Sequence, residues 1–119
     1  MIPKKFRAWD KENKEFIDNL TILDLLHRIN GAWDDMEFSQ FTGLLDKNGV
    51  LIYEGDIIEV RYNGGWTEIG VAEYWEFLGK YVFNEVSDDP SEPKGLFDFN
   101  DACPMFVIGN IYENPELLK

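Results

Sequence analysis

The sequence has one cysteine, Cys103, and one histidine, His27, among 119 residues. A single cysteine cannot form an intramolecular disulfide, and it excludes a cysteine-rich zinc site. One histidine is too few for two-histidine metal sites, and no histidine lies near Cys103 in sequence to activate it. We therefore predict a protein that is not an enzyme, with no catalytic residue, no metal site and no cofactor. Cys103 is interpreted as a buried structural thiol and His27 as a surface residue.

Basic residues are also scarce, because 11 Lys and Arg stand against 23 Asp and Glu, for a net charge of −12. This balance argues against general nucleic-acid binding, which depends on Lys and Arg contacts to phosphates. It also argues against docking on an anionic membrane. The charge is uneven: residues 1–14 carry +3 and residues 15–119 carry −15. The basic segment, residues 1–14, can therefore pair with the acidic surface of its own molecule or of a neighbouring subunit.

Long apolar runs are absent, and none approaches the ~18 residues of a membrane helix. Residues 1–14 lack the apolar segment of a secretory signal, so we expect a cytoplasmic protein. What the chain does contain is 45% hydrophobic residues, including 15% aromatic residues. This content is typical of a folded domain rather than of a disordered acidic tail. We predict a single domain spanning residues 1–119.

The hydrophobic patterns predict a mainly β fold with little helix. Aromatic segments at 6–9 and 15–17 indicate an N-terminal hairpin. Residues 22–29 carry apolar side chains at helical spacing and predict one short helix. From residue 37 onward the period is two, and we expect strands, separated by glycine-containing turns, at 38–44, 50–53, 57–62, 66–75, 80–86 and 105–108.

Three further features complete the predicted architecture. Gly70 in the middle of a strand indicates a bulge or a sharp coil of the sheet. Residues 87–95 contain prolines and acids and predict a loop, and Asn114 with Pro115 predicts a C-terminal helical turn. The whole is a β-rich α+β protein. Its small meander forms an SH3-like, partly closed barrel, and the N-terminal hairpin and helix cover one opening or edge.

Three stretches of the sequence resemble the YopX family. They are Gln40–Gly49 with Ile52–Ile57, Phe6–Asp10 near the start, and Ile108–Leu118 at the end. Together they span nearly the whole chain in the family's order, whereas Gly64–Cys103 carries no family motif. The resemblance implies a small protein encoded by bacteriophages and prophages, located in the host bacterial cytoplasm. It implies no activity and no catalytic or binding residue.

Read physically, the motif residues are typical of turns and close backbone contacts rather than of chemistry. Arg7 is expected to pair with Asp10 or Asp56 across adjacent strands. Glu54 and Asp56 are read as turn residues, with a metal or acid–base pair as the alternative. Asp88, Asp89 and Glu92 are read as a solvated loop, with a calcium site as the alternative. The predicted structural set is Arg7, Trp9, Phe41, Gly43, Asn48, Gly49, Tyr53, Gly55, Asp56, Gly109, Asn110 and Pro115.

Tryptophan and tyrosine are more numerous than one small core usually needs. Core packing is the first interpretation, and an interaction surface that includes Trp33, Trp66 and Trp75 is the second. We predict a non-enzymatic protein–protein interaction module that binds an unidentified protein or a second copy of itself. Two alternatives stay open: an acidic DNA mimic that inhibits a host nucleic-acid-handling protein, and a small-ligand-binding barrel. Direct nucleic-acid binding has support only from the basic residues near the N-terminus.

Overall fold

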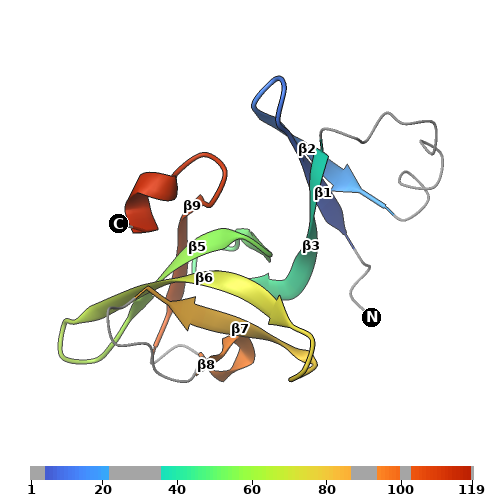
Figure 1. Ribbon diagram of the computed structural model, residues 1–119. Helices are drawn as coiled ribbons and strands as arrows, with labels where there is room; N and C mark the ends of the chain where they lie inside the picture. Colours follow the sequence, from blue (N-terminus) through green and yellow to red (C-terminus); the bar gives the residue numbers. More distant parts are fainter. Residues whose placement is uncertain (1–4, 22–35, 87–93, 100–102, 119) are drawn as a thin grey trace.

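The computed structural model describes residues 5–21, 36–86, 94–99 and 103–118, which form two antiparallel sheets with very little helix (Figure 1). The predicted mainly β fold is confirmed. The strands are β1 Phe6–Asp10, β2 Glu15–Leu20, β3 Met36–Leu45, β4 Leu51–Tyr53, β5 Asp56–Arg61, β6 Thr67–Trp75, β7 Lys80–Glu85, β8 Lys94–Gly95 and β9 Met105–Asn110. The 3-10 helices are η1 Leu96–Asp98 and η2 Pro115–Leu118.

The first sheet has the order β2-β1-β3-β4. The N-terminal half of β3 pairs with β1, whereas its C-terminal half pairs with β4 and reaches the second sheet (Figure 1). The register between β3 and β4 shifts between Phe41 and Leu45. Gly43 lies inside this shift with a φ of 91°, a conformation that glycine adopts without a steric penalty. The bend in β3 therefore connects the two sheets.

The second sheet has the order β8-β7-β6-β5-β9 and curves into a half-barrel. Its concave side holds the core, and the hairpin between β3 and β4 closes against β9, because the Lys47 N–H donates to the Met105 carbonyl at 2.9 Å. The predicted partly closed barrel is confirmed. The buried core side chains are Ile52, Ile58, Val60, Ala72, Phe83, Leu96 and Met105.

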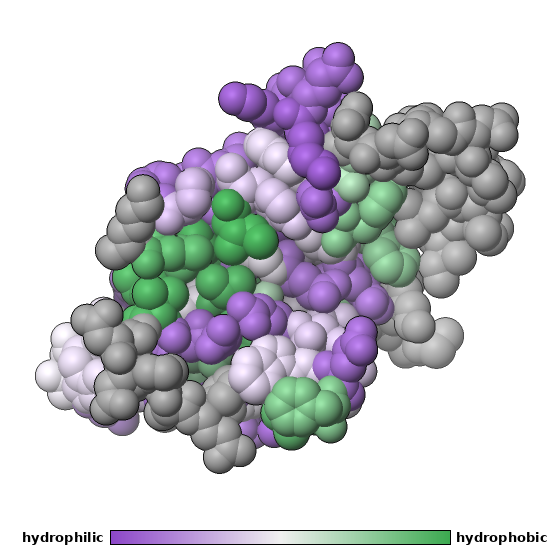
Figure 2. Space-filling view, viewed as in Figure 1, coloured by the Kyte–Doolittle hydropathy of each residue, from purple (hydrophilic) through white to green (hydrophobic). Residues whose placement is uncertain are grey.

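The opposite side of this sheet also carries apolar side chains. Ala72 faces the core, so Ile69, Val71 and Trp75, at odd-numbered positions of β6, face away from it. The Val86 N–H donates to the Ile69 carbonyl at 2.9 Å, which sets Val86 beside Ile69. We call these four residues the outer face. Figure 2 shows an apolar area over β5 and β6 and a second one at the end of the β6–β7 hairpin.

The structure corrects two expectations about loops and bulges. Lys94 and Gly95, predicted as part of a loop over 87–95, form strand β8 opposite Phe83 and Val82. Strand β6 runs past Gly70 with unbroken register to both neighbours, so of the two alternatives predicted there the bulge is wrong. The helix predicted at 22–29 and residues 87–93 lie outside the described residues. Among the residues that are described, no helix is long and apolar enough to cross a membrane.

Gly70 is required for close packing instead. A Cβ atom at this position would lie 2.6 Å from the Asn84 carbonyl oxygen and 2.8 Å from the Phe83 ring. We expect Gly70→Ala to lower the free energy of unfolding by about 1–3 kcal/mol, because the β7 backbone must move. Urea denaturation measures this change. Thr67→Ala, at an exposed position of the same strand, is the control, and an unaltered midpoint for Gly70→Ala would contradict the packing role.

Candidate functional site: the junction between the two sheets

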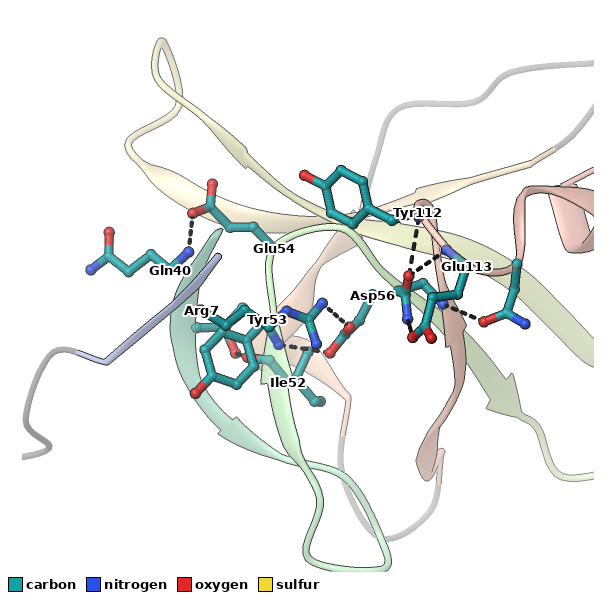
Figure 3. Close-up of polar contacts among 11 residues, drawn as sticks. Arg7, Gln40, Ile52, Tyr53, Glu54, Asp56, Tyr112 and Glu113 are labelled. Carbon is teal, nitrogen blue, oxygen red and sulfur yellow. Dashed lines mark hydrogen bonds and ion pairs between the residues drawn. The ribbon is translucent and has the colours of Figure 1, made fainter. Parts of the chain in front are cut away.

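An ion pair between Arg7 and Asp56 joins β1 of the first sheet to β5 of the second (Figure 3). The two side chains are only 11% and 2% exposed. The other carboxylate oxygen of Asp56 accepts the Tyr53 N–H at 2.8 Å. Of the two predicted partners of Arg7, the structure selects Asp56. The Asp10 carboxylate instead accepts the N–H groups of Glu12 and Asn13 in the β1–β2 turn.

Aromatic rings enclose this ion pair. The Arg7 guanidinium lies over the Phe16 ring at 4.4 Å and over the Tyr53 ring at 4.7 Å, the geometry of cation–π contacts. Trp9 packs against Phe16 at 4.8 Å and stacks on Tyr112 at 5.5 Å. Apart from Phe16, these residues come from the three stretches that resemble a family. The motifs therefore meet at one place, which is the joint between the sheets.

Asp56 and Glu54, the predicted turn residues, both make internal hydrogen bonds. Burial raises the pKa of its carboxyl group, whereas Arg7 and the Tyr53 N–H lower that pKa. Both carboxylate oxygens are already engaged. The Glu54 carboxylate accepts the Gln40 N–H at 2.8 Å and so ties the turn to β3 (Figure 3). Across the described ranges, no group of three or more His, Cys, Asp or Glu side chains is placed to hold a metal ion.

The C-terminal segment is folded back onto the joint by Asn110. Its side-chain oxygen accepts the N–H groups of Tyr112 at 3.0 Å and Glu113 at 2.8 Å. Asn114 in turn accepts the Asn110 N–H at 3.2 Å. A Cβ atom on Gly109 would lie 2.7 Å from that Asn114 oxygen, so glycine is needed there. These contacts place Tyr112 against Trp9. Helix η2 begins three residues later in the chain, at Pro115.

A groove of about 350 Å³ lies beside the joint, between the two sheets. The turn at Gly55 forms its floor: the Gly55 N–H donates to the Ala72 carbonyl at 2.8 Å, and the Gly55 carbonyl accepts the Ile111 N–H at 2.9 Å. The groove was not predicted from the sequence, because its walls come from four separate segments. Its lining residues are Phe38, Ser39, Glu54, Gly55, Val71, Ala72, Glu73, Ile111, Tyr112 and Leu118.

The structure describes two of the three tryptophans of the predicted interaction surface. Trp66 is 55% exposed and stacks on Tyr62 at 4.1 Å. Trp75 is half-buried on the outer face, donates its indole N–H to Glu73 at 2.9 Å and packs against Phe77. Trp33 lies outside the described residues. Phe77 is 80% exposed in the β6–β7 turn, and sequence reasoning did not single it out.

A second polar cluster lies at the other end of the half-barrel. Lys94 donates to the Glu68 carboxylate at 2.9 Å and to the Tyr62 hydroxyl at 3.1 Å. The neighbouring Glu68 carboxylate raises the pKa of Glu85. Burial raises the pKa of Glu68, but the Lys94 ammonium, together with Glu85 and Tyr62, outweighs burial, and the pKa is lowered. Glu85 is therefore the carboxyl group of this pair that takes up a proton first.

This order of protonation predicts a pH-dependent effect of Glu85→Gln. The carboxylate form of Glu85 repels Glu68, so the variant should melt at a higher temperature than the parent near pH ~7. As the pH falls through the raised pKa of Glu85, the parent becomes neutral there and the difference should vanish by about pH 4. Thermal melts across this range test it. Glu76→Gln, in an exposed turn, is the control, and a difference independent of pH would refute the assignment.

Comparison with known proteins supports a single family. A protein-family model described as YopX protein matches residues 5–119. The crystal structure of protein EF1440 from Enterococcus faecalis is similar with a TM-score of 0.66 and 28% sequence identity, over 100% of both chains. The crystal structure of YopX from Bacillus subtilis has a TM-score of 0.56 and 14% identity, over 97% of this chain and 98% of that one. The second likeness shows the fold alone. No curated protein matches the sequence.

Proposed function

The chain belongs to the YopX family, and from that premise we propose that it is a phage- or prophage-encoded accessory protein that works as a protein–protein interaction module and not as an enzyme. The Arg7, Asp56 and Asn110 side chains, which the motifs supply, make internal contacts that hold the sheets and the C-terminal segment together. Binding would then use surface that these internal contacts leave exposed.

Exposed apolar side chains on the second sheet carry this proposal. Val86 is 44% exposed on the outer face, and Phe77 and Leu78 are 80% and 39% exposed in the β6–β7 turn. Figure 2 shows the apolar areas over the sheet and at the hairpin end as two separate patches. Single exposed apolar residues are common, but neighbouring ones that include aromatic rings are typical of interaction sites. Trp75, on the outer face, contacts Phe77 in the turn. The DNA-mimic alternative has only the net charge in its favour.

Site-specific photo-crosslinking tests the proposal. A benzophenone amino acid replaces Phe77 or Val86, and the protein is irradiated in the bacterium that encodes it. We expect adducts from both positions and none from a third probe at Glu12, which is exposed in the β1–β2 turn of the other sheet. Mass spectrometry of the adducts separates a second copy of the chain from another protein. Equal or absent crosslinking at all three positions would contradict the proposal.

A further inference from the structure

We propose that the groove between the sheets receives an arginine side chain of the protein partner. This inference rests on the proposed function, because the groove opens next to the outer face and shares Val71 with it. The groove has two carboxylates, Glu54 and Glu73, and none of its lining residues is basic. Its charge therefore complements a cation, whereas a phosphate or a carboxylate would be repelled.

Both carboxylates are held in place by neutral donors. Glu54 accepts the Gln40 N–H at 2.8 Å. Glu73 accepts the Trp75 indole N–H at 2.9 Å and the Asn84 amide at 3.2–3.3 Å. These bonds fix the orientation of the carboxylates without neutralising their charge. A cation that enters the groove meets preorganised acceptors, which lowers the entropy lost on binding.

Aromatic walls favour a guanidinium over an ammonium group. Phe38 is 40% exposed and lines the groove together with Tyr112, whose ring lies across from Glu54 in Figure 3. A planar guanidinium stacks on aromatic rings and bonds to carboxylates through its fork of N–H groups, which an ammonium does not do. The protein uses this chemistry elsewhere: Arg61 lies over the Phe106 ring at 3.9 Å and pairs with Glu59 at 2.8 Å.

The groove is small and has room for one long side chain. About 350 Å³ is at the lower end of ligand-binding pockets, so the groove does not hold a folded segment. Ile111 and Leu118 supply apolar contacts for the aliphatic stem of the arginine. The apolar outer face next to it would contact the surrounding partner surface and exclude water. A buried arginine within an apolar contact area is typical of the energetic centre of an interface.

The probe that tests this inference is N-acetyl-arginine amide, added to the 15N-labelled protein. We expect amide resonances of Gly55, Glu73 and Tyr112 to shift in a saturable manner, with a dissociation constant of about 1–10 mM. N-acetyl-citrulline amide has the same shape without the charge and should cause no saturable shift. N-acetyl-lysine amide should bind more weakly than the arginine probe. Equal shifts with citrulline, or shifts confined to other residues, would overturn the inference.

Variants assign the binding to the groove. Glu54→Gln keeps an oxygen for the Gln40 N–H but removes the charge, and we expect it to weaken binding of the arginine probe about 3- to 10-fold. Glu76→Gln removes the same charge from an exposed turn outside the groove and should have no effect. If both variants weaken binding equally, the probe responds to net charge alone and the inference fails. The spectra also verify that each variant is folded.

The two proposals fail in different ways. Crosslinks at Phe77 and Val86 without saturable binding of the arginine probe would reject the arginine site and retain the interaction module. Saturable probe binding at Gly55, Glu73 and Tyr112 without any crosslink would retain a cation-binding groove and reject the interaction module.

Discussion

Arg7→Ala is expected to lower the free energy of unfolding by about 3–5 kcal/mol, because it leaves the Asp56 carboxylate buried without its cation. Asp56 is 2% exposed, so bulk solvent screens its charge little. The substitution also removes the group that lies over the Phe16 and Tyr53 rings, and it breaks an ion pair between the two sheets. Urea denaturation followed by tryptophan fluorescence measures the loss.

The control for this variant is Lys11→Ala. Lys11 pairs with Glu37 at 3.2 Å, but both side chains are about half exposed, at 50% and 51%. Exposed pairs of this kind contribute at most about 1 kcal/mol. The double variant Arg7→Ala/Asp56→Ala should lose less stability than the sum of its single variants, because neither charge is then left unpaired. A loss for Arg7→Ala no larger than for Lys11→Ala would show that the pair does not hold the sheets together.

Local signals in the sequence predict the hairpin turns well. The turns expected at 46–49, 54–56 and 76–79 each contain a glycine with positive φ: Gly49 at 83°, Gly55 at 86° and Gly79 at 64°. Such turns depend on the conformational freedom of one residue and its immediate neighbours. The types of these residues can be read directly from the sequence. The period of two in the following strands is equally local. For this reason the mainly β fold and the partly closed barrel could be predicted.

Contacts between distant segments could not be predicted in the same way. Arg7 has a carboxylate three residues away in Asp10 and another 49 residues away in Asp56, and only the folded register shows that it pairs with the distant one. The groove depends on β3 leaving one sheet to join the other, so its lining is a property of the tertiary structure. The exposure of Phe77 could not be predicted either, because a turn prediction does not say whether another element covers the turn.

Asp46 makes both local and distant contacts, and replacing it is the second change for which we expect a large loss of stability. The sequence predicts it as a turn residue, and one carboxylate oxygen accepts the N–H groups of Asn48 at 2.8 Å and Val50 at 2.9 Å. The other oxygen accepts the Val107 N–H of β9 at 3.0 Å, a contact 61 residues away. Asp46→Ala should lower the free energy of unfolding by about 2–4 kcal/mol, because three N–H groups lose a charged acceptor.

Asn48→Ala is the matched control, because it changes the same turn while its backbone N–H still donates to Asp46. The Asn48 side chain is exposed, and its backbone does not adopt a positive φ, so the loss should stay below about 1 kcal/mol. Hydrogen exchange then locates the effect of Asp46→Ala. The Val107 amide should exchange faster, whereas amides in the middle of β6 should retain their protection relative to global unfolding. If Val107 keeps its full protection in the folded variant, Asp46 acts only within its turn and does not hold the hairpin against β9.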